Sequence, residues 1–530
     1  MKIYLQNRIN DLDQISRLLC AGVTLAIVAL WSMHLVKGNN PFCNETTLLL
    51  GSLLFLILMA EVVLVDASVK APVIVLVFLQ ASAFIPGVFS LLLIPDTVFT
   101  PLTLDGVTQV NEGLSYLCIG SLAFCLCFLL ANYLEAANRE ALFHDQTHKI
   151  ESSFYEGRGI LALLSAFIVV VLLSKLPFWL GISQYFHGQS APMLWNTILQ
   201  LQVLLFDPDS ITLLAAYSAS RMNITPKRRL QLLVMISCIY LAASISGGSR
   251  SGLMRLLIFS LVIALALEVR VKVKWKTIGT YLGVLIAGCL VVFVLATHVR
   301  LKLASAEYLS MNGVPLIEET VAKPDSTEQS SMGIHPDLAK ALARGVFSEI
   351  ASRLAVPFFS AIQATTHETN NEARQRYFSI EYTIKSVANN LPGTPFPEAE
   401  LGTSRLFGVI YREETEEQVL QHGYFSEFYT AWGLSYLFFG RLGGLFALAL
   451  SGFLLAFVFA FVHKKRQEYP ALQLWALFIL PGSILFTQGF DHTLWLWMVT
   501  GLRIAISAYI LKSFFNMFEG VSIANASDNS

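Results

Sequence analysis

The chain has 530 residues, of which 55% are hydrophobic and only 14% are charged, and its mean hydropathy is +0.60. A soluble protein of this length would expose too much apolar surface to stay dispersed, so most of the chain is expected to lie in lipid. The formal net charge of -1 argues against nucleic acid as a partner.

The first half of the chain is predicted to contain nine membrane spans. A helix needs about 20 apolar residues to cross the roughly 30 Å hydrocarbon layer. The first apolar run follows a polar start, 1–17, and lacks a small-residue cleavage site, so we expect a retained span and not a signal peptide. The predicted spans are 15–36, 46–66, 71–94, 112–134, 159–180, 194–218, 229–246, 251–269 and 277–297.

A large polar loop, 298–427, follows the ninth span. Residues 305–333 are rich in Ser, Glu and Pro and are expected to form a mobile cover. The periodicity of 336–364 predicts a helix, and 370–390 is predicted as a second helix that ends before the Pro-rich stretch 391–397. We expect these amphipathic helices to lie over the membrane face.

Three more spans complete the chain, at 440–463, 470–489 and 492–514. Arg503 lies well inside the last span, and the Asp207-Pro208-Asp209 run breaks the sixth. Because an unpaired Arg at mid-membrane costs roughly 2.5–3.5 kcal/mol, a partner is expected. We hypothesise that Arg503 pairs with Asp207 or Asp209, and we favour a structural role for this pair.

Lys and Arg in the short loops set the predicted direction of the spans. They gather on one side, whereas the loops 95–111 and 181–193 contain none. The sequence therefore predicts an all-α polytopic membrane protein with about twelve spans, both termini in the cytoplasm and one large extracytoplasmic loop. The predicted units are the bundle 1–297, the loop 298–427, the spans within 428–517 and a cytoplasmic tail, 518–530.

Cofactor chemistry has no signature in the sequence. The seven cysteines form no disulfide or metal framework, and six of them fall in apolar segments. The chain has no zinc-spaced His/Cys cluster, no Gly-rich nucleotide loop and no Gly-x-Ser-x-Gly elbow. We therefore predict no metal and no cofactor.

The turn between the seventh and eighth spans is a candidate anion site. Its sequence, 247–252, is Gly-Gly-Ser-Arg-Ser-Gly, and the following helix would point its positive N-terminal end at the outer surface. Arg250 lies in this turn and Arg255 about one helical turn deeper, a pattern suited to phosphate or pyrophosphate. The alternative is a tight turn whose Arg contacts lipid headgroups.

The end of the large loop carries an acid, a base and several rings. His422 and Glu427 could take a proton from a hydroxyl nucleophile, and Tyr424 and Tyr429 could stack on sugars. The alternative is an aromatic belt at the membrane surface. Elsewhere in the loop, Arg353 and Arg405 have the most apolar surroundings of the arginines and are candidate anion ligands.

Two of these stretches resemble a known family. The Ser-Gly-Gly-Ser-Arg-Ser-Gly turn, and Ser-Glu-Phe-Tyr-Thr-Ala-Trp-Gly at 426–433, are similar to motifs of the bacterial polysaccharide polymerase and O-antigen ligase superfamily. His422 matches the spacing of a ligase motif, but Gly423 stands where that motif has Asn, which favours a repeat-unit polymerase. The architecture is also that expected of a C-type membrane glycosyltransferase.

The resemblance implies a function and a location. The substrate would be an oligosaccharide linked to undecaprenyl pyrophosphate, at the extracytoplasmic face of a bacterial cytoplasmic (inner) membrane. A polymerase would transfer the growing glycan onto a sugar hydroxyl of the next repeat unit. Arg250, with Arg255, Arg353 or Arg405, would stabilise the leaving pyrophosphate, and His422 or Glu427 would act as base. A chain-length regulator and a flippase would be possible partners.

Three other functions remain open at this point. An O-antigen ligase would differ only in its acceptor, the lipid A core. A glycosyltransferase that uses polyprenyl-monophosphate sugars usually has an acidic pair in its first outer loop, where 37–46 offers only Glu45. A transporter of polysaccharide or of lipid-linked oligosaccharide would be expected to carry more polar residues through several spans.

Overall fold

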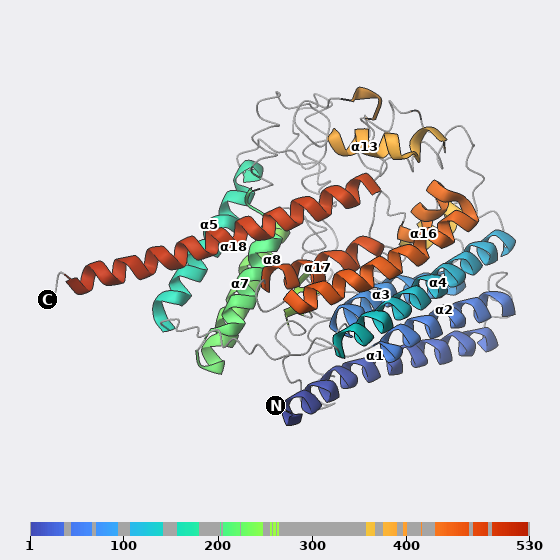
Figure 1. Ribbon diagram of the computed structural model, residues 1–530, viewed down its shortest axis with the longest axis horizontal. Helices are drawn as coiled ribbons and strands as arrows, with labels where there is room; N and C mark the ends of the chain where they lie inside the picture. The colour runs from blue at the N-terminus through green and yellow to red at the C-terminus, as the bar shows by residue number, and fades with distance from the viewer. Residues whose placement is uncertain are drawn as a thin grey trace, which may run out of the picture.

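The computed structural model of the chain describes twelve labelled helical elements (Figure 1). The described residues are 2–36, 44–65, 70–93, 107–140, 156–179, 202, 205–222, 224–246, 255–256, 258–260, 262–263, 357–365, 375–389, 396–399, 415, 430–465, 470–485 and 490–527. The elements are α1 (Lys2–Val36), α2 (Glu45–Leu64), α3 (Lys70–Leu93), α4 (Val107–Glu140), α5 (Glu156–Trp179), α7 (Pro208–Arg221), α8 (Pro226–Ser246), α13 (Ile380–Ala388), the 3-10 turn η1 (Pro397–Ala399), α16 (Thr430–Lys465), α17 (Pro470–Leu485) and α18 (Phe490–Ser527). No strand occurs in these ranges, which confirms the all-α prediction for this part of the chain.

Seven helices among the described residues are long and apolar enough to cross a membrane. They coincide with the predicted spans one to five, ten and twelve: Ser16–Met33, Glu45–Leu64, Lys70–Leu91, Val110–Glu135, Gly159–Leu176, Thr430–Lys465 and Trp497–Met517. Helices α7, α8 and α17 fall in the predicted spans six, seven and eleven. A membrane protein with several apolar helices is thus confirmed, whereas twelve spans and their orientation stay predictions.

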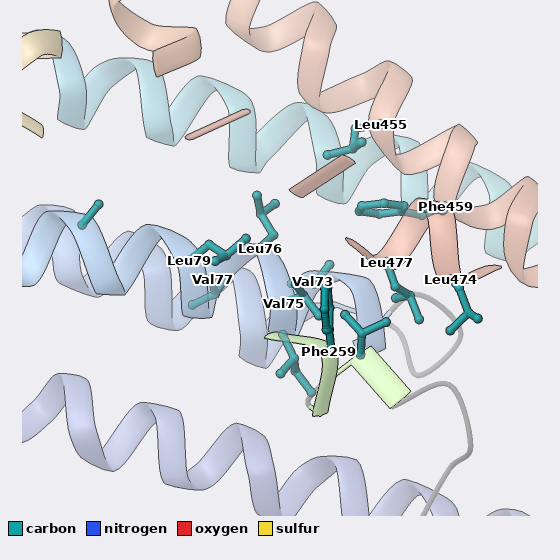
Figure 2. Close-up of a cluster of buried hydrophobic side chains, with 14 of the residues drawn as sticks. Val73, Val75, Leu76, Val77, Leu79, Phe259, Leu455, Phe459, Leu474 and Leu477 are labelled. Atoms are coloured by element: carbon teal, nitrogen blue, oxygen red, sulfur yellow. The ribbon is translucent and has the colours of Figure 1, made fainter. Parts of the chain in front are cut away.

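The helices form two groups that meet along α17 and α18 (Figure 1). The first group contains α1, α2, α3, α4, α16 and α17, with α4 packed against both α2 and α16. The second contains α5, α7, α8 and α18. Phe259 joins the groups, since its ring contacts Tyr240 of α8 and Phe478 of α17. Figure 2 shows Phe259 among valines and leucines of α3 and α17 in the core.

Large apolar side chains cover the outside of the first group. Leu122, Leu126 and Leu130 of α4 are exposed at a spacing of four residues, as are Leu442 and Phe446 of α16. This spacing places each set on one helix face. Contiguous apolar stripes of this kind suit contact with lipid and not with water.

Glycines allow α4 and α16 to approach closely. A Cβ atom on Gly120 of α4 would lie 2.7 Å from Leu448 Cδ1 and 3.0 Å from Trp432 Cδ1. One on Gly452 of α16 would collide with the backbone carbonyl of Phe124. The contacts advance by four residues in both helices, so the two run parallel in register and pack through small residues, as membrane helices commonly do.

Helix α16 folds back on itself at Gly440. The backbone there has φ 72° and ψ -172°, a conformation that is not helical and that essentially only glycine adopts. A Cβ on Gly444 would lie 2.8 Å from the carbonyl oxygen of Ser435, and Trp432 and Leu448 meet at Gly120. Residues 430–439 therefore return along the side of 441–465, and the predicted tenth span corresponds to the second limb alone.

One segment of the large loop packs inside the first group of helices. All residues of the helical segment 357–365 are buried. Phe358 lies against Gly87 of α3, and a Cβ on Gly113 of α4 would lie 2.8 Å from Ile362 Cγ2. The prediction that 336–364 lies over the membrane face is therefore wrong for this segment, because two glycines open a slot between α3 and α4. Residues 336–356 lie outside the described part.

The predicted second loop helix, 370–390, is interrupted: residues 375–377 are helical, residues 378–379 are not, and α13 begins at Ile380. Ser379 caps α13, since its hydroxyl accepts a hydrogen bond from the Tyr382 N–H at 3.1 Å. Lys385 bonds Glu381 at 2.8 Å and Glu398 of η1 at 3.1 Å, and these two carboxylates raise the pKa of Lys385. Figure 1 shows α13 beside the Phe490 end of α18, and the Phe378 ring contacts Phe438 of the returning limb.

We predict that Gly440→Ala destabilises the protein. A side chain in this backbone conformation is strained by about 1–3 kcal/mol, so the hairpin of α16 would open or distort. Thermal unfolding in detergent should show a clear fall in midpoint.

The matched control is Gly22→Ala. Gly22 lies inside α1, and a Cβ there would meet no atom within 4 Å. This variant should be as stable as the parent or more so, because Ala favours a helix by about 1 kcal/mol over Gly. Equal midpoints for Gly440→Ala and the parent would show that the turn does not need glycine.

Candidate functional site

Helix α7 starts inside the membrane-spanning region. Asp207 is its N-cap and Pro208 its first residue. The Asp207 carboxylate accepts hydrogen bonds from the Ser210 N–H at 3.0 Å and from the Ser210 hydroxyl at 2.5 Å. A buried helix end must satisfy its free N–H groups in this way. The predicted break of the sixth span at 207–209 is confirmed.

Two Asp–Arg pairs gather at this break, and we name Asp207, Asp209, Arg255 and Arg503 the charge cluster. Arg503 Nη1 of α18 lies 3.9 Å from Asp207 Oδ1, which confirms the predicted partner of Arg503. Arg255 is ion-paired to Asp209, a contact that was not anticipated. The cluster thus connects α7 to α18 and to the segment that follows the 247–252 turn.

Further polar groups surround the charge cluster. The Tyr240 hydroxyl of α8 donates to Asp209 Oδ1 at 2.6 Å. Lys175 of α5 interacts electrostatically with Asp209 and Arg255. Three cationic side chains therefore face two carboxylates among the described residues, so the neighbourhood carries an excess of positive charge.

The predicted topology places the charge cluster well below the membrane surface. Helix α7 has 14 residues and ends at Arg221, in the predicted cytoplasmic corner with Lys227 and Arg228. At 1.5 Å per residue, Asp207 is about 20 Å from that corner, in a hydrocarbon layer of roughly 30 Å. At the predicted depth, water would screen such ion pairs only weakly, most of all the more buried Arg503–Asp207 pair.

Arg255 is the one predicted anion ligand among the described residues. Its side chain is 45% exposed although it is paired with Asp209. A phosphate at this place would compete with Asp209 for the same guanidinium group. Its role as a pyrophosphate ligand stays a prediction. Tyr240 and Lys175 were not predicted, because nothing in a single sequence places them next to Asp209.

The described chain resumes after the predicted catalytic segment at Thr430. Thr430 has φ 60°, in the left-handed region that a β-branched residue rarely adopts. It is fully buried, as is Trp432, whose ring contacts Phe84 of α3 at 5.4 Å between centroids. The chain directly after the loop therefore enters the bundle, whereas residues 422–429 lie outside the described part, so both interpretations of them stay predictions.

The other predicted site residues lie outside the described part of the chain. They are Arg250, Arg353, Arg405, His422, Tyr424, Glu427 and Tyr429. Within the described ranges, no group of three or more His, Cys, Asp or Glu could hold a metal ion. The structure therefore describes the surroundings of the predicted site and not its predicted acid, base and sugar-binding rings.

Comparison of the chain with protein-family models, with curated proteins and with solved structures finds no match.

We predict that Asp207→Asn and Arg503→Met each destabilise the protein, and that their effects are not additive. Asp207→Asn keeps an oxygen for the N-cap but leaves Arg503 without its carboxylate, at a cost of up to about 3 kcal/mol. The double variant removes both charges and should lose less than the sum of the singles, by roughly 0.5–3 kcal/mol. Unfolding in mixed detergent would measure all three.

The control for this cycle is Lys512→Met. Lys512 lies in α18 as well, but it is exposed. Its loss should leave stability nearly unchanged and should show no coupling to Asp207→Asn. Strict additivity of Asp207→Asn and Arg503→Met would mean that the contact between the two side chains does not contribute to the free energy of unfolding.

Proposed function

We propose that the protein is a membrane glycosyltransferase that polymerises glycans. In this proposal it transfers a growing glycan from undecaprenyl pyrophosphate onto a sugar hydroxyl of the next lipid-linked repeat unit. The reaction would take place at the extracytoplasmic face of a bacterial inner membrane. It needs an anion site for the leaving pyrophosphate and a base for the acceptor hydroxyl, and no cofactor.

The anchoring of the large loop is the observation that carries the proposal. Segment 357–365 of the loop is buried between helices of the first group, and directly after the loop Thr430 and residues 432–435 are buried there too. The predicted base residues, His422 and Glu427, therefore lie only a few residues before a fixed point, Thr430. Catalysis needs reacting groups held in place, and a loop fixed at two points on a rigid bundle suits that need. The strained backbone of Thr430 supports this, because such strain persists where surroundings enforce it and gathers at functional sites.

The charge near Arg255 gives further support. Arg255, Arg503 and Lys175 outnumber the two carboxylates they face, and Arg255 keeps nearly half of its side chain exposed. An anionic group that bound there would offset part of this excess positive charge. Arg255 also follows the 247–252 turn, where Arg250 is predicted to contact the same pyrophosphate.

Elongation by the purified protein tests the proposal. Proteoliposomes with undecaprenyl-pyrophosphate-linked repeat units should produce a ladder of longer glycans on a gel. Arg250→Ala should lower the initial rate by about 10²-fold or more, because it removes a group that stabilises charge in the transition state. Either His422→Ala or Glu427→Ala should do the same, since one of them is the predicted base.

Arg441→Ala is the matched control for these variants. Arg441 is an exposed arginine next to the Gly440 turn, and its removal should leave the ladder unchanged. Full activity in Arg250→Ala would exclude the anion site. Full activity in both His422→Ala and Glu427→Ala would exclude the base. A single shift upon addition of lipid A core, without a ladder, would favour a ligase.

Transport of a polysaccharide or lipid-linked oligosaccharide is the second candidate. It is favoured by α7, a helix that starts at mid-membrane beside paired charges, because transporters often place substrate or ion sites at such broken helices. The same proteoliposomes distinguish the two. Movement of unelongated lipid-linked oligosaccharide between leaflets, without a ladder, would replace polymerisation by transport.

A further inference from the structure

Buried polar groups without hydrogen-bond partners follow the length of α4. The described residues of the first group include six such side chains, each at most 4% exposed: Glu61, Gln80, Tyr116, Ser121, Gln363 and Trp432. Native proteins leave few buried polar groups unsatisfied, and internal water usually supplies the missing bonds. The second group also contains such atoms, on Arg229, Trp497, Arg503 and Ser507, but the six side chains of the first group lie around one helix, α4, and internal water is the expected source of their missing bonds.

Contacts with α4 order these groups in space. Gln363 follows Ile362, which lies against Gly113, and the Tyr116 hydroxyl lies against Gly444 of α16. Trp432 contacts Gly120, the residue before Ser121. Between Gly113 and Ser121 these groups are spread over about 12 Å along α4, and the series begins at the end of α4 that contacts segment 357–365.

Glu61 lies at the far end of this series. It faces α4, where it interacts electrostatically with Cys125, one helical turn beyond Ser121. Both of its carboxyl oxygens are buried and have no hydrogen-bond partner. An unpaired carboxylate in such a place would cost far more than a neutral acid, so the protonated form is favoured.

Gln80 of α3 lies at about the same level in the bundle as Glu61 of α2. Helices α2 and α3 are antiparallel and meet where a Cβ on Gly51 would lie 3.1 Å from Val88 Cγ1. Glu61 lies ten residues beyond Gly51 and Gln80 eight residues before Val88, so both are about 12–15 Å from that contact. Gln80 also lies one turn from Phe84, whose ring contacts Trp432.

The ionisable surroundings of Glu61 are simple. Cys125 of α4 is the titratable group that interacts with it from the packed helices, and Glu61 forms no ion pair within the described ranges. On α1, the uncharged Thr24 contacts Met59 of α2, two residues before Glu61. No neighbouring charge among these described groups would therefore stabilise an ionised Glu61.

We infer that Glu61 is a proton-binding site inside the bundle. A file of water molecules, held by Ser121, Trp432, Tyr116 and Gln363, connects it to the bundle end where the large loop is anchored. The ligand is a proton, exchanged between the Glu61 carboxyl group and this water. The inference does not depend on the proposed glycan chemistry, because it rests only on α2, α3, α4, α16 and the buried segment 357–365.

Infrared spectroscopy of the full-length protein in lipid tests the inference. A protonated buried carboxyl group has a C=O stretching band that is separate from those of carboxylates. This band should be lost in Glu61→Gln, should move in Glu61→Asp and should be unchanged in Glu112→Gln, which alters an exposed carboxyl of α4. If no band depends on Glu61, the residue is ionised and the inference fails.

Transfer into D2O tests the water file. The Glu61 band of the parent should shift as the O–H proton exchanges for deuterium. Ser121→Val, which fills the file with an apolar side chain, should slow this shift severalfold, and so should Trp432→Phe, which removes the indole N–H. Ser115→Val, at a partly exposed position of α4 outside the file, should not slow it.

Two results would overturn the file. The first is a Glu61 band that does not shift in D2O. The second is a shift at the parent rate in both Ser121→Val and Trp432→Phe, which would mean that the proton arrives by another route. Neither measurement uses glycan elongation, so a failed polymerase assay would leave this inference standing, and the reverse also holds.

Discussion

The close approach of other segments to α4 is the constraint on which the rest of the structure depends. Gly113 accepts segment 357–365, Gly120 accepts Trp432 and Leu448, and Gly452 of α16 lies against the backbone of Phe124. Without side chains at these glycines, backbones approach and gain dispersion contacts that lipid cannot supply between distant helices. Segment 357–365 of the large loop and the limb of α16 that follows the loop are therefore both held by α4, so this helix positions any site built on the loop.

In the second group, the charge cluster holds the helices in place, as the close contacts with α4 do in the first group. Apolar packing alone does not fix the rotation of one membrane helix against another, because lipid tails compete equally for apolar surfaces. The Arg503–Asp207 and Arg255–Asp209 pairs do fix it, since breaking either would leave a charge in a medium of low dielectric constant. Asp207 has a second task as N-cap of α7, so the helix break and the ion pair stabilise each other.

Hydropathy predicted the seven described helices that are long and apolar enough to cross a membrane, and the cost of an unpaired charge predicted that Arg503 pairs with Asp207 or Asp209. Both follow from the lipid environment and need no knowledge of neighbours. The return of 430–439 was missed because Gly440 looks like the ordinary start of a span; the nearby Gly443-Gly444 pair was the available signal. The burial of 357–365 could not be predicted, since its slot is formed by Gly87 and Gly113, far away in sequence. Tyr240 and Lys175 were missed for the same reason.

Buried carboxyl groups thus have two different kinds of surroundings in this protein. In the second group each carboxylate of the charge cluster is ion-paired to a guanidinium group, although the Nε atom of Arg503 has no hydrogen-bond partner. In the first group Glu61, Gln80 and Ser121 are more deeply buried, and their side-chain polar atoms have no hydrogen-bond partner in the protein. Apolar residues at those three positions would pack against the surrounding apolar side chains without the cost of burying an unpaired polar group. Their presence in the group that also anchors the large loop implies that water belongs to this part of the structure, and a bundle that holds water next to an anchored loop can supply or remove protons there.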